Sequence, residues 1–308
     1  MAVEYIITFG IFALGLVMLI KGSDLFVEAA TRVAKGFGVS EFIIALVLAS
    51  IATTLPEVTT SAIAAYQGAS GIALGNAIGS ALANIALILG LSALIMPLDV
   101  HRIAWENTLF MIGVTLYAWV LMRDLVISRI EGLSLVLMYL GFLYYLYKKH
   151  VTLEEAKEGK GHLKKDIAIL FASGLVVVLG ARLVVDSAVK IATAFGIPEV
   201  IIGLTLVSVG TSLPEMANSI AATLKKIPNI SVGNIVGANI LNILIVIGVA
   251  ALIRPINVNP DIYSFTMPLT LVVMAILAVS LKLNNRVGRK TGVVLLALYA
   301  YFLYVSFT

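Results

Sequence analysis

The residues IATTLPE at positions 51–57 return as VGTSLPE at positions 209–215, and this pair of stretches decides how the chain folds. They belong to a longer match: residues 22–97 align without a gap on residues 180–255, with about 30 of 76 positions identical at a constant offset of 158. Any two apolar helices share leucine and isoleucine. Shared Thr, Pro, Glu, Gly and Asn at one offset instead indicate a true internal repeat.

The composition places this repeat in a membrane. Of the 308 residues, 60% are hydrophobic and 12% are charged, and the mean hydropathy is +1.06. A soluble domain carries about 45–50% apolar and about 25% charged residues. The net charge of +4 forms no basic face, which excludes a nucleic-acid binder. The absence of cysteine excludes a disulfide scaffold, a thiolate zinc site and a cysteine nucleophile.

Ten segments are long and apolar enough to cross a bilayer as helices. The alternating pattern of a transmembrane barrel is absent. We therefore predict an all-α polytopic membrane protein of ten transmembrane helices, with spans near residues 4–20, 40–66, 72–97, 103–122, 127–147, 166–186, 197–224, 229–253, 262–281 and 291–307.

A hydrophilic segment from Lys148 to Asp166 divides these spans into two groups of five. The predicted organisation is a first half at 1–150, a linker at 151–165 and a second half at 166–308. Because each half holds an odd number of spans, the second must enter the membrane with the opposite orientation. Such inverted five-helix repeats are typical of secondary transporters, whose substrate sites lie near the bilayer midplane on interrupted helices.

The distribution of basic residues predicts the orientation, because cytoplasmic loops are enriched in Lys and Arg. With the N-terminus outside, 16 of the 21 basic residues fall in inner connections and 5 in outer ones. We therefore expect a multi-pass protein of the cell membrane with both termini extracellular and the 148–166 segment cytoplasmic.

Two glutamates lie where membrane helices rarely carry charge. Glu57 is the one charged residue between Phe42 and Leu98, and its counterpart Glu215 lies inside the predicted seventh span. An ionisable group at mid-bilayer costs about 2.5–3.5 kcal/mol on insertion scales, and no predicted span offers a Lys or Arg to neutralise either. A protonated glutamate that links helices by hydrogen bonds is one interpretation. Two glutamates at equivalent positions of an inverted repeat favour the other, a cation site.

Oxygen-bearing groups accompany each glutamate. A threonine, Thr53 or Thr211, precedes each by four residues and so shares its helical face. The proline directly before each glutamate removes a backbone donor, so carbonyls of the preceding turn lose their usual partners. Carboxylate, hydroxyl and carbonyl oxygens are the ligands that Ca²⁺ prefers, and Na⁺ uses the same atom types.

A second matching pair, GNAIGSALANIALILG at 75–90 and GNIVGANILNILIVIG at 233–248, adds small and amide residues. Ser80 and Asn84 are four residues apart, so both can face the glutamates. Asn84 and Asn242 are interpreted as ligands ahead of simple links between helices, whereas linking is favoured for Asn76 and Asn234. The spacing of Gly75, Gly79, Gly233 and Gly237 is that of small residues which let helices approach closely.

Machinery for other chemistry is missing from the sequence. His101, His150 and His162 fall in connections without metal-ligand spacing, and no HExxH, GxSxG or P-loop motif is present. We therefore expect neither an enzyme nor a cofactor. A cation channel stays open as an alternative, although channels usually build pores by oligomeric symmetry, whereas this site would be completed within one chain.

The motif T[TS]LPE followed by GNxxG[SA], present twice, resembles the α-repeats of the cation/calcium exchanger superfamily, most closely its prokaryotic sodium/calcium exchanger branch. The resemblance implies an antiporter that exchanges Na⁺ for Ca²⁺ by alternating access, electrogenically, with about three Na⁺ per Ca²⁺. The proton-coupled branch usually carries GNxxE, where this chain has Gly79 and Gly237. A proton-coupled Ca²⁺ exchanger of the same fold is therefore the less favoured alternative.

The resemblance also implies a ligand set and two departures from it. Position 238 is Ala where Ser is usual, so one hydroxyl is missing. Asn242 stands where potassium-dependent relatives carry Asp, which argues against K⁺ co-transport. The implied ligands are the carboxylates of Glu57 and Glu215, the hydroxyls of Thr53, Thr54, Thr211 and Ser212, backbone carbonyls near Ser50 and Ser208, and the side chains of Ser80, Asn84 and Asn242.

The first and sixth spans lack a T[TS]LPE motif and contain little but apolar residues, so we expect them to be the moving parts. Gly22 and Gly180 are the expected flex points. The expected partners are Na⁺, Ca²⁺ and the lipid bilayer, with no obligate protein partner.

Overall fold

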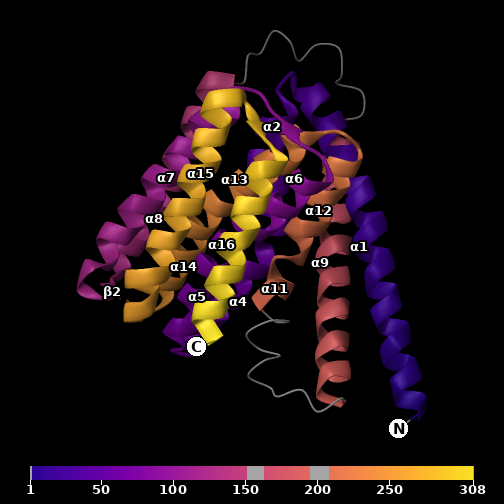
Figure 1. Cartoon of the computed structure of the whole chain (residues 1–308), viewed down its shortest axis with the longest axis horizontal. Coiled ribbons are helices and arrows are strands. Elements are labelled where there is room, and N and C mark those ends of the chain that lie inside the picture. The colour runs from indigo at the N-terminus through magenta and orange to yellow at the C-terminus, as the bar shows by residue number, and fades with distance from the viewer. Residues whose placement is uncertain (1, 151–162, 195–207, 308) are drawn as a thin grey trace.

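The computed structural model describes residues 2–150, 163–194 and 208–307, and these are almost entirely helical (Figure 1). Six of the described helices are long and apolar enough to cross a membrane, or up to seven if Glu41–Thr53 and Leu55–Tyr66 form one bent span. The all-α polytopic architecture is confirmed. The start of the predicted seventh span and most of the predicted linker lie outside the described residues.

The elements of the chain before residue 151 begin with one long helix and end with two helices flanked by short strands. They are α1 (Ala2–Phe37), α2 (Glu41–Ile44), the π-helical η1 (Ala45–Ala49), α3 (Ser50–Thr53), α4 (Leu55–Tyr66), α5 (Ser70–Ala83), the π-helical η2 (Asn84–Leu89), α6 (Gly90–Ile95), β1 (Leu98–Asp99), α7 (Ile103–Leu121), the 3-10 turn η3 (Met122–Asp124), β2 (Val126–Ile127) and α8 (Arg129–His150).

The later elements follow a closely similar order. They are α9 (Leu163–Ala194), α11 (Ser208–Thr211), α12 (Leu213–Leu224), α13 (Pro228–Leu241), the π-helical η6 (Asn242–Val246), α14 (Ile247–Ile253), β3 (Ile256–Asn257), the π-helical η7 (Ile262–Thr266), α15 (Met267–Asn284), β4 (Arg286–Val287) and α16 (Arg289–Phe307).

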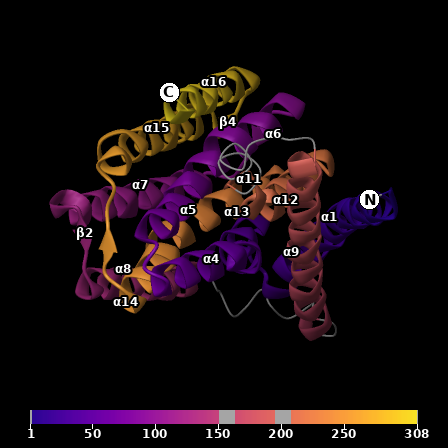
Figure 2. The ribbon, with the colours of Figure 1, turned by 90° about the horizontal axis from the view of Figure 1, so that it is seen from below.

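Helices α1 and α9 pack along each other at one side of the molecule (Figures 1 and 2). Small residues let them approach: a Cβ built on Gly180 would lie 2.8 Å from the Cβ of Met18, and one on Gly22 would lie 2.9 Å from Val177. The glycines expected to be flex points thus lie inside continuous helices and serve the contact between them.

The helix that holds the first predicted span, 4–20, is longer than that span, because α1 continues to Phe37. Its second half carries Phe26, Ala30, Val33 and Ala34 at helical spacing, and all four are buried in a cluster that includes Leu170 of α9. Burial of this apolar stripe favours helix well beyond the membrane-spanning length.

The centre of the molecule is formed by the two continuous stretches Ser70–Ile95 and Pro228–Ile253. In these stretches 72% and 83% of the apolar window is buried, compared with 28% in α1 and in α8. They carry the second repeated motif, which therefore lies in the core and not on a lipid-facing surface.

The two halves of the chain are joined by reciprocal contacts. Strand β1 pairs antiparallel with β4, and β2 pairs antiparallel with β3. Helix α6 packs on α16 where Gly90 meets Gly292, and α14 packs on α8 where Gly248 meets Gly132. The contact of β1 with β4 is thus repeated as that of β3 with β2, and the contact of α6 with α16 is repeated as that of α14 with α8.

We predict that Gly132→Ala destabilises the protein. A Cβ at this position would lie 2.8 Å from the Gly248 carbonyl oxygen and 2.8 Å from the Cβ of Ala251. Overpacking of this kind costs about 1–3 kcal/mol. The measurement is the loss of the monodisperse peak after heating in detergent. Gly113→Ala is the matched control, since a Cβ there meets nothing within 4 Å; equal melting of both variants would contradict the assigned contact.

Candidate cation-binding site

Each predicted glutamate lies in the first turn of a helix that begins inside the protein. Helices α4 and α12 both start with Leu-Pro-Glu, directly after a residue whose backbone leaves the helical region, Thr54 in one half and Ser212 in the other. Proline suits a first turn because its missing N–H has no intrahelical role there. The first of these breaks bends the chain by 45°. The interruption expected from the prolines is confirmed.

The two carboxylates are neighbours in a fully buried site. The Thr54 hydroxyl, at the start of the helix that carries Glu57, donates to Glu215 Oε1 at 3.2 Å. Glu57 and Glu215 are both 0% exposed, and the bond from Thr54, three residues before Glu57, brings the two side chains into one buried region. Positive helix N-termini favour negative side chains in the first turn. Two carboxylates buried in one region still require neutralisation by a cation or by protons.

Amides from the opposite half orient the two predicted threonines. Thr53 donates to Asn234 Oδ1 at 3.4 Å, and Thr211 donates to Asn76 Oδ1 at 3.2 Å. Asn76 also donates to the Glu57 carbonyl oxygen at 3.2 Å. A hydroxyl that donates its hydrogen bond to an amide oxygen still has lone pairs on its own oxygen, and these can bind a cation. Asn76 and Asn234 therefore link helices, as predicted, and orient ligands as well.

Further predicted ligands belong to segments that reach across to the opposite half. Asn84 and Asn242 each begin a π-helical turn, η2 and η6. Segment η2 packs against α12, which carries Glu215, and η6 packs against α4, which carries Glu57. Single π-turns inside helices are frequent at functional sites because they re-aim side chains.

Oxygen atoms of the predicted ligands are buried without a hydrogen-bond partner. Leaving such atoms unpaired costs free energy that a bound cation would recover. Among the described residues, the predicted ligand atoms in this state are Glu57 Oε1 and Oε2, Glu215 Oε2, Ser80 Oγ, Asn84 Oδ1, Ser212 Oγ and Asn242 Oδ1.

The described residues contain no group of three or more His, Cys, Asp or Glu that could hold a metal. The candidate site therefore combines two carboxylates with neutral oxygens. That set suits Na⁺ and Ca²⁺, which are hard cations, better than transition metals.

Ser50 and Ser208 were expected to contribute backbone carbonyls. The Ser50 carbonyl lies 3.4 Å from the Thr53 hydroxyl oxygen and is an alternative acceptor to Asn234 for its one proton, and the Ser50 hydroxyl donates to the Leu46 carbonyl at 2.6 Å. The side chain of Ser208 lies outside the described part of the structure. Ala238 is fully buried and brings a methyl group where Ser80 brings a hydroxyl.

The close approach expected at the repeated glycines is present in one half. A Cβ on Gly233 would lie 2.6 Å from the Phe42 carbonyl oxygen, and one on Gly237 would lie 2.7 Å from Ser50 Oγ. At Gly75 and Gly79 a Cβ would meet no described atom within 4 Å.

Asn239 is a site residue that the sequence reasoning missed. Asn84 Nδ2 donates to Asn239 Oδ1 at 3.0 Å, and Asn239 Nδ2 donates to the Ala81 carbonyl oxygen at 3.0 Å. These bonds fix the Asn84 amide so that its Oδ1 is left for a ligand. The counterpart of Asn239 in the first half is Ala81, so a comparison of the halves passes over it.

The architecture and the buried oxygen cluster define a multi-pass membrane protein with a candidate cation site where its two halves meet. Comparison with known sequences shows which family within this class the chain belongs to. The profile of the sodium/calcium exchanger protein family matches residues 7–148 and 165–308. The chain belongs to this family.

Relatives and solved structures agree over nearly the whole chain. Sodium/calcium exchanger MaX1 of Methanosarcina acetivorans is 33% identical, covering 98% of this chain and 99% of that protein. Membrane protein MJ0091 of Methanocaldococcus jannaschii is 38% identical over 94% and 95% of the two chains. A solved structure of the sodium-calcium exchanger NCX_Mj superposes with a TM-score of 0.89 at 36% identity, covering 97% of this chain and 99% of that one.

We predict that Glu57→Gln and Glu215→Gln each weaken Ca²⁺ binding by about 100-fold or more. Removing one charge of a buried, paired set costs about 3–5 kcal/mol, and 1.4 kcal/mol is a factor of ten. The measurement is equilibrium ⁴⁵Ca²⁺ binding to the purified protein. Glu41→Gln is the control, since Glu41 also lies in a helix first turn but outside the site. Near wild-type affinity in either site variant would rule out a paired-carboxylate site.

Proposed function

We propose that the chain is a secondary active antiporter that exchanges Na⁺ for Ca²⁺ across the membrane by alternating access. The observation that carries the proposal is the buried pair Glu57 and Glu215, which has no basic partner among the described residues and is surrounded by unpartnered oxygens. A transporter of this kind binds and releases ions without chemical change, so it is not an enzyme and needs no cofactor.

The two loads would use overlapping ligands. One Ca²⁺ is balanced by both carboxylates together, whereas several Na⁺ share the carboxylates with the neutral oxygens of Ser80, Asn84 and Asn242. Because Na⁺ and Ca²⁺ use some of the same ligands, binding of one ion displaces the other. With about three Na⁺ per Ca²⁺ the cycle moves net charge and responds to the membrane potential.

The same proposal includes ten transmembrane helices in two inverted repeats, at 1–150 and 166–308, joined by a cytoplasmic linker at 151–165. Three reciprocal sets support it: the strand pairs β1–β4 and β2–β3, the glycine contacts of α6 with α16 and of α14 with α8, and the Thr–Asn bonds across the site. A pseudo-two-fold axis in the membrane plane generates such exchanged pairs.

Two cavities beside the site support alternating access. One of about 540 Å³ lies between α4 and α9 and is lined by Pro56, Thr211 and Pro214, next to the ligands. The other, of about 380 Å³, lies between α1 and α12 and is lined by Ser23, Asp24 and Lys225. The helices α1 and α9, which line one cavity each, would slide against the core to open the two in turn.

Ion pairs join the two helices that line the smaller cavity. Lys225 Nζ lies 3.4 Å from Asp24 Oδ1 and 3.1 Å from Glu28 Oε1, which ties α12 to α1. The hydrogen bond to Glu28 raises the pKa of Lys225, so the ammonium stays charged. In the first half, Gln67 corresponds to Lys225. We infer a structure closed on the Lys225 side and, with both termini extracellular, open toward the outside.

We predict that Lys225→Gln increases access to the closed side. In a chain without cysteine, Ala217→Cys places one thiol in the smaller cavity. Labelling by an impermeant maleimide in inside-out vesicles should rise several-fold when Lys225→Gln is added, because exposed or partly exposed ion pairs are worth about 1 kcal/mol each. Arg182→Gln, which alters the Arg182–Asp186 pair near the other cavity, is the control. No increase specific to Lys225→Gln would contradict the closing role.

The proposed exchange itself is tested by ⁴⁵Ca²⁺ uptake into proteoliposomes. Vesicles loaded with Na⁺ should accumulate Ca²⁺, and vesicles loaded with K⁺ or provided with only a pH gradient should not.

Because Asn242 adds no third negative charge, external K⁺ should leave the flux unchanged, and the flux should depend little on pH between about 6 and 8. Asn242→Asp should make uptake fall as pH drops. Uptake into K⁺-loaded vesicles would indicate a channel, and uptake driven by a pH gradient alone would indicate proton coupling; either result would contradict the proposal.

A further inference from the structure

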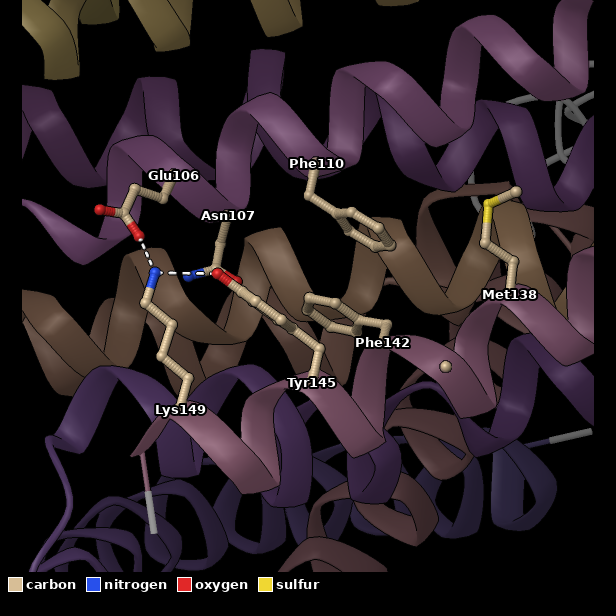
Figure 3. Close-up of a pocket in the computed structure, with 8 residues that line it drawn as sticks. Glu106, Asn107, Phe110, Met138, Phe142, Tyr145 and Lys149 are labelled. Atoms are coloured by element: carbon tan, nitrogen blue, oxygen red, sulfur yellow. Dashed lines mark hydrogen bonds and ion pairs between the residues drawn. The ribbon is translucent and has the colours of Figure 1, made fainter. Parts of the chain in front are cut away.

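A groove of about 480 Å³ lies between α7 and α8, on a part of the protein that the cation site does not use. Figure 3 shows residues of the two helices facing each other across it, with a polar cluster at one end and Met138 at the other. Neither helix contributes a ligand to the candidate cation site, so the groove needs a separate explanation.

The polar end of the groove has the character of a membrane–water interface. Lys149 Nζ lies 2.5 Å from Glu106 Oε2 and donates to the Tyr145 hydroxyl at 2.9 Å. The adjacent Lys148 lies over the ring of Tyr144, 5.3 Å from its centroid. Tyrosine and lysine gather where helices leave the hydrocarbon layer. This end therefore lies at the level of lipid head groups.

The rest of the groove is apolar and long. Phe110 and Phe142 stack with centroids 4.3 Å apart and planes 7° from parallel, and they form its middle (Figure 3). From Lys149 to Met138 helix α8 advances eleven residues, about 16 Å at 1.5 Å per residue. An opening of this length matches most of one lipid chain.

The equivalent place in the second half is filled by the protein itself. Helix α16 matches α8 at an offset of 160, so that Tyr299, Tyr301 and Phe302 correspond to Tyr139, Gly141 and Phe142. There the Tyr301 ring packs edge-on against Phe265 with centroids 6.0 Å apart. At Gly141 an added Cβ would meet nothing within 4 Å. The groove exists because glycine replaces this tyrosine.

We propose that the groove is a binding site for one phospholipid, with a hydrocarbon chain along Phe110, Phe142 and Gly141 and the phosphate group bound by Lys149 and Lys148. The second lysine selects a phospholipid over a neutral lipid: Lys149 is paired with Glu106, whereas Lys148 adds a positive charge beside the groove, and basic groups between membrane helices bind phosphate-bearing head groups. The Glu106 carboxylate holds the Lys149 ammonium across the mouth of the groove, where a phosphate at the head-group level would meet it.

The test is native mass spectrometry of the delipidated full chain with added phosphatidylethanolamine. Wild type should retain one lipid at concentrations where further lipids dissociate. Gly141→Leu fills the groove and should lower the retained fraction about fivefold or more. Lys149→Gln should lower it by about fivefold, since one basic group near the membrane surface is worth about that factor.

The matched control is Gly113→Leu, another helical glycine with open space around it, which should retain the lipid like wild type. Retention in both Gly141→Leu and Lys149→Gln equal to wild type would overturn the site. Loss in Gly113→Leu as large as in Gly141→Leu would also overturn it, because the lipid would then be one of the general shell. Ion transport does not enter the readout, so this result is independent of the proposed exchange.

Discussion

Two carboxylates buried in one region, Glu57 and Glu215, are the constraint on which the rest of the structure depends. In a low-dielectric interior neither charge is tolerated alone, and together they repel. Two helices begin at the site, so the partial positive charge of their N-termini lies near the carboxylates, and amides orient the neutral ligands. In the proposed function a cation balances the remaining charge, and a competing cation can replace it.

Much of this arrangement could be predicted from the repeat. A fixed offset shared by Thr, Pro, Glu and Asn identified the glutamates, their accompanying hydroxyls and the breaks before them. The repeat also placed Asn84 and Asn242, which the structure puts at the start of π-turns against the opposite half. These residues are predictable because symmetry forces both copies into equivalent surroundings.

Features that differ between the two halves were not predicted from the sequence. Asn239 was overlooked because its counterpart is Ala81, although an amide buried three residues before Asn242 was a usable signal. The length of α1 was underestimated because the limit was taken from membrane thickness, whereas burial against α9 and the core extends the helix to Phe37. Side-chain packing between distant segments decides such features, and periodicity alone does not report it.

The asymmetric positions are also where the two halves acquire different roles. Lys225 stands where the first half has Gln67 and ties α12 to α1, and Gly141 stands where the second half has Tyr301 and lines an open groove. Ala238 against Ser80 removes one hydroxyl from one side of the site. The residues that the two halves share thus form their common structure, and the residues that differ between the halves make the two sides of the molecule different.

The central claim is that Na⁺ and Ca²⁺ compete for one set of ligands. Equilibrium ⁴⁵Ca²⁺ binding to the purified protein, titrated with Na⁺ at constant ionic strength, tests it most directly. The account predicts complete displacement of Ca²⁺ with a dependence on Na⁺ steeper than first order, and no displacement by K⁺. Bound Ca²⁺ that persists at saturating Na⁺ would show separate sites and contradict it.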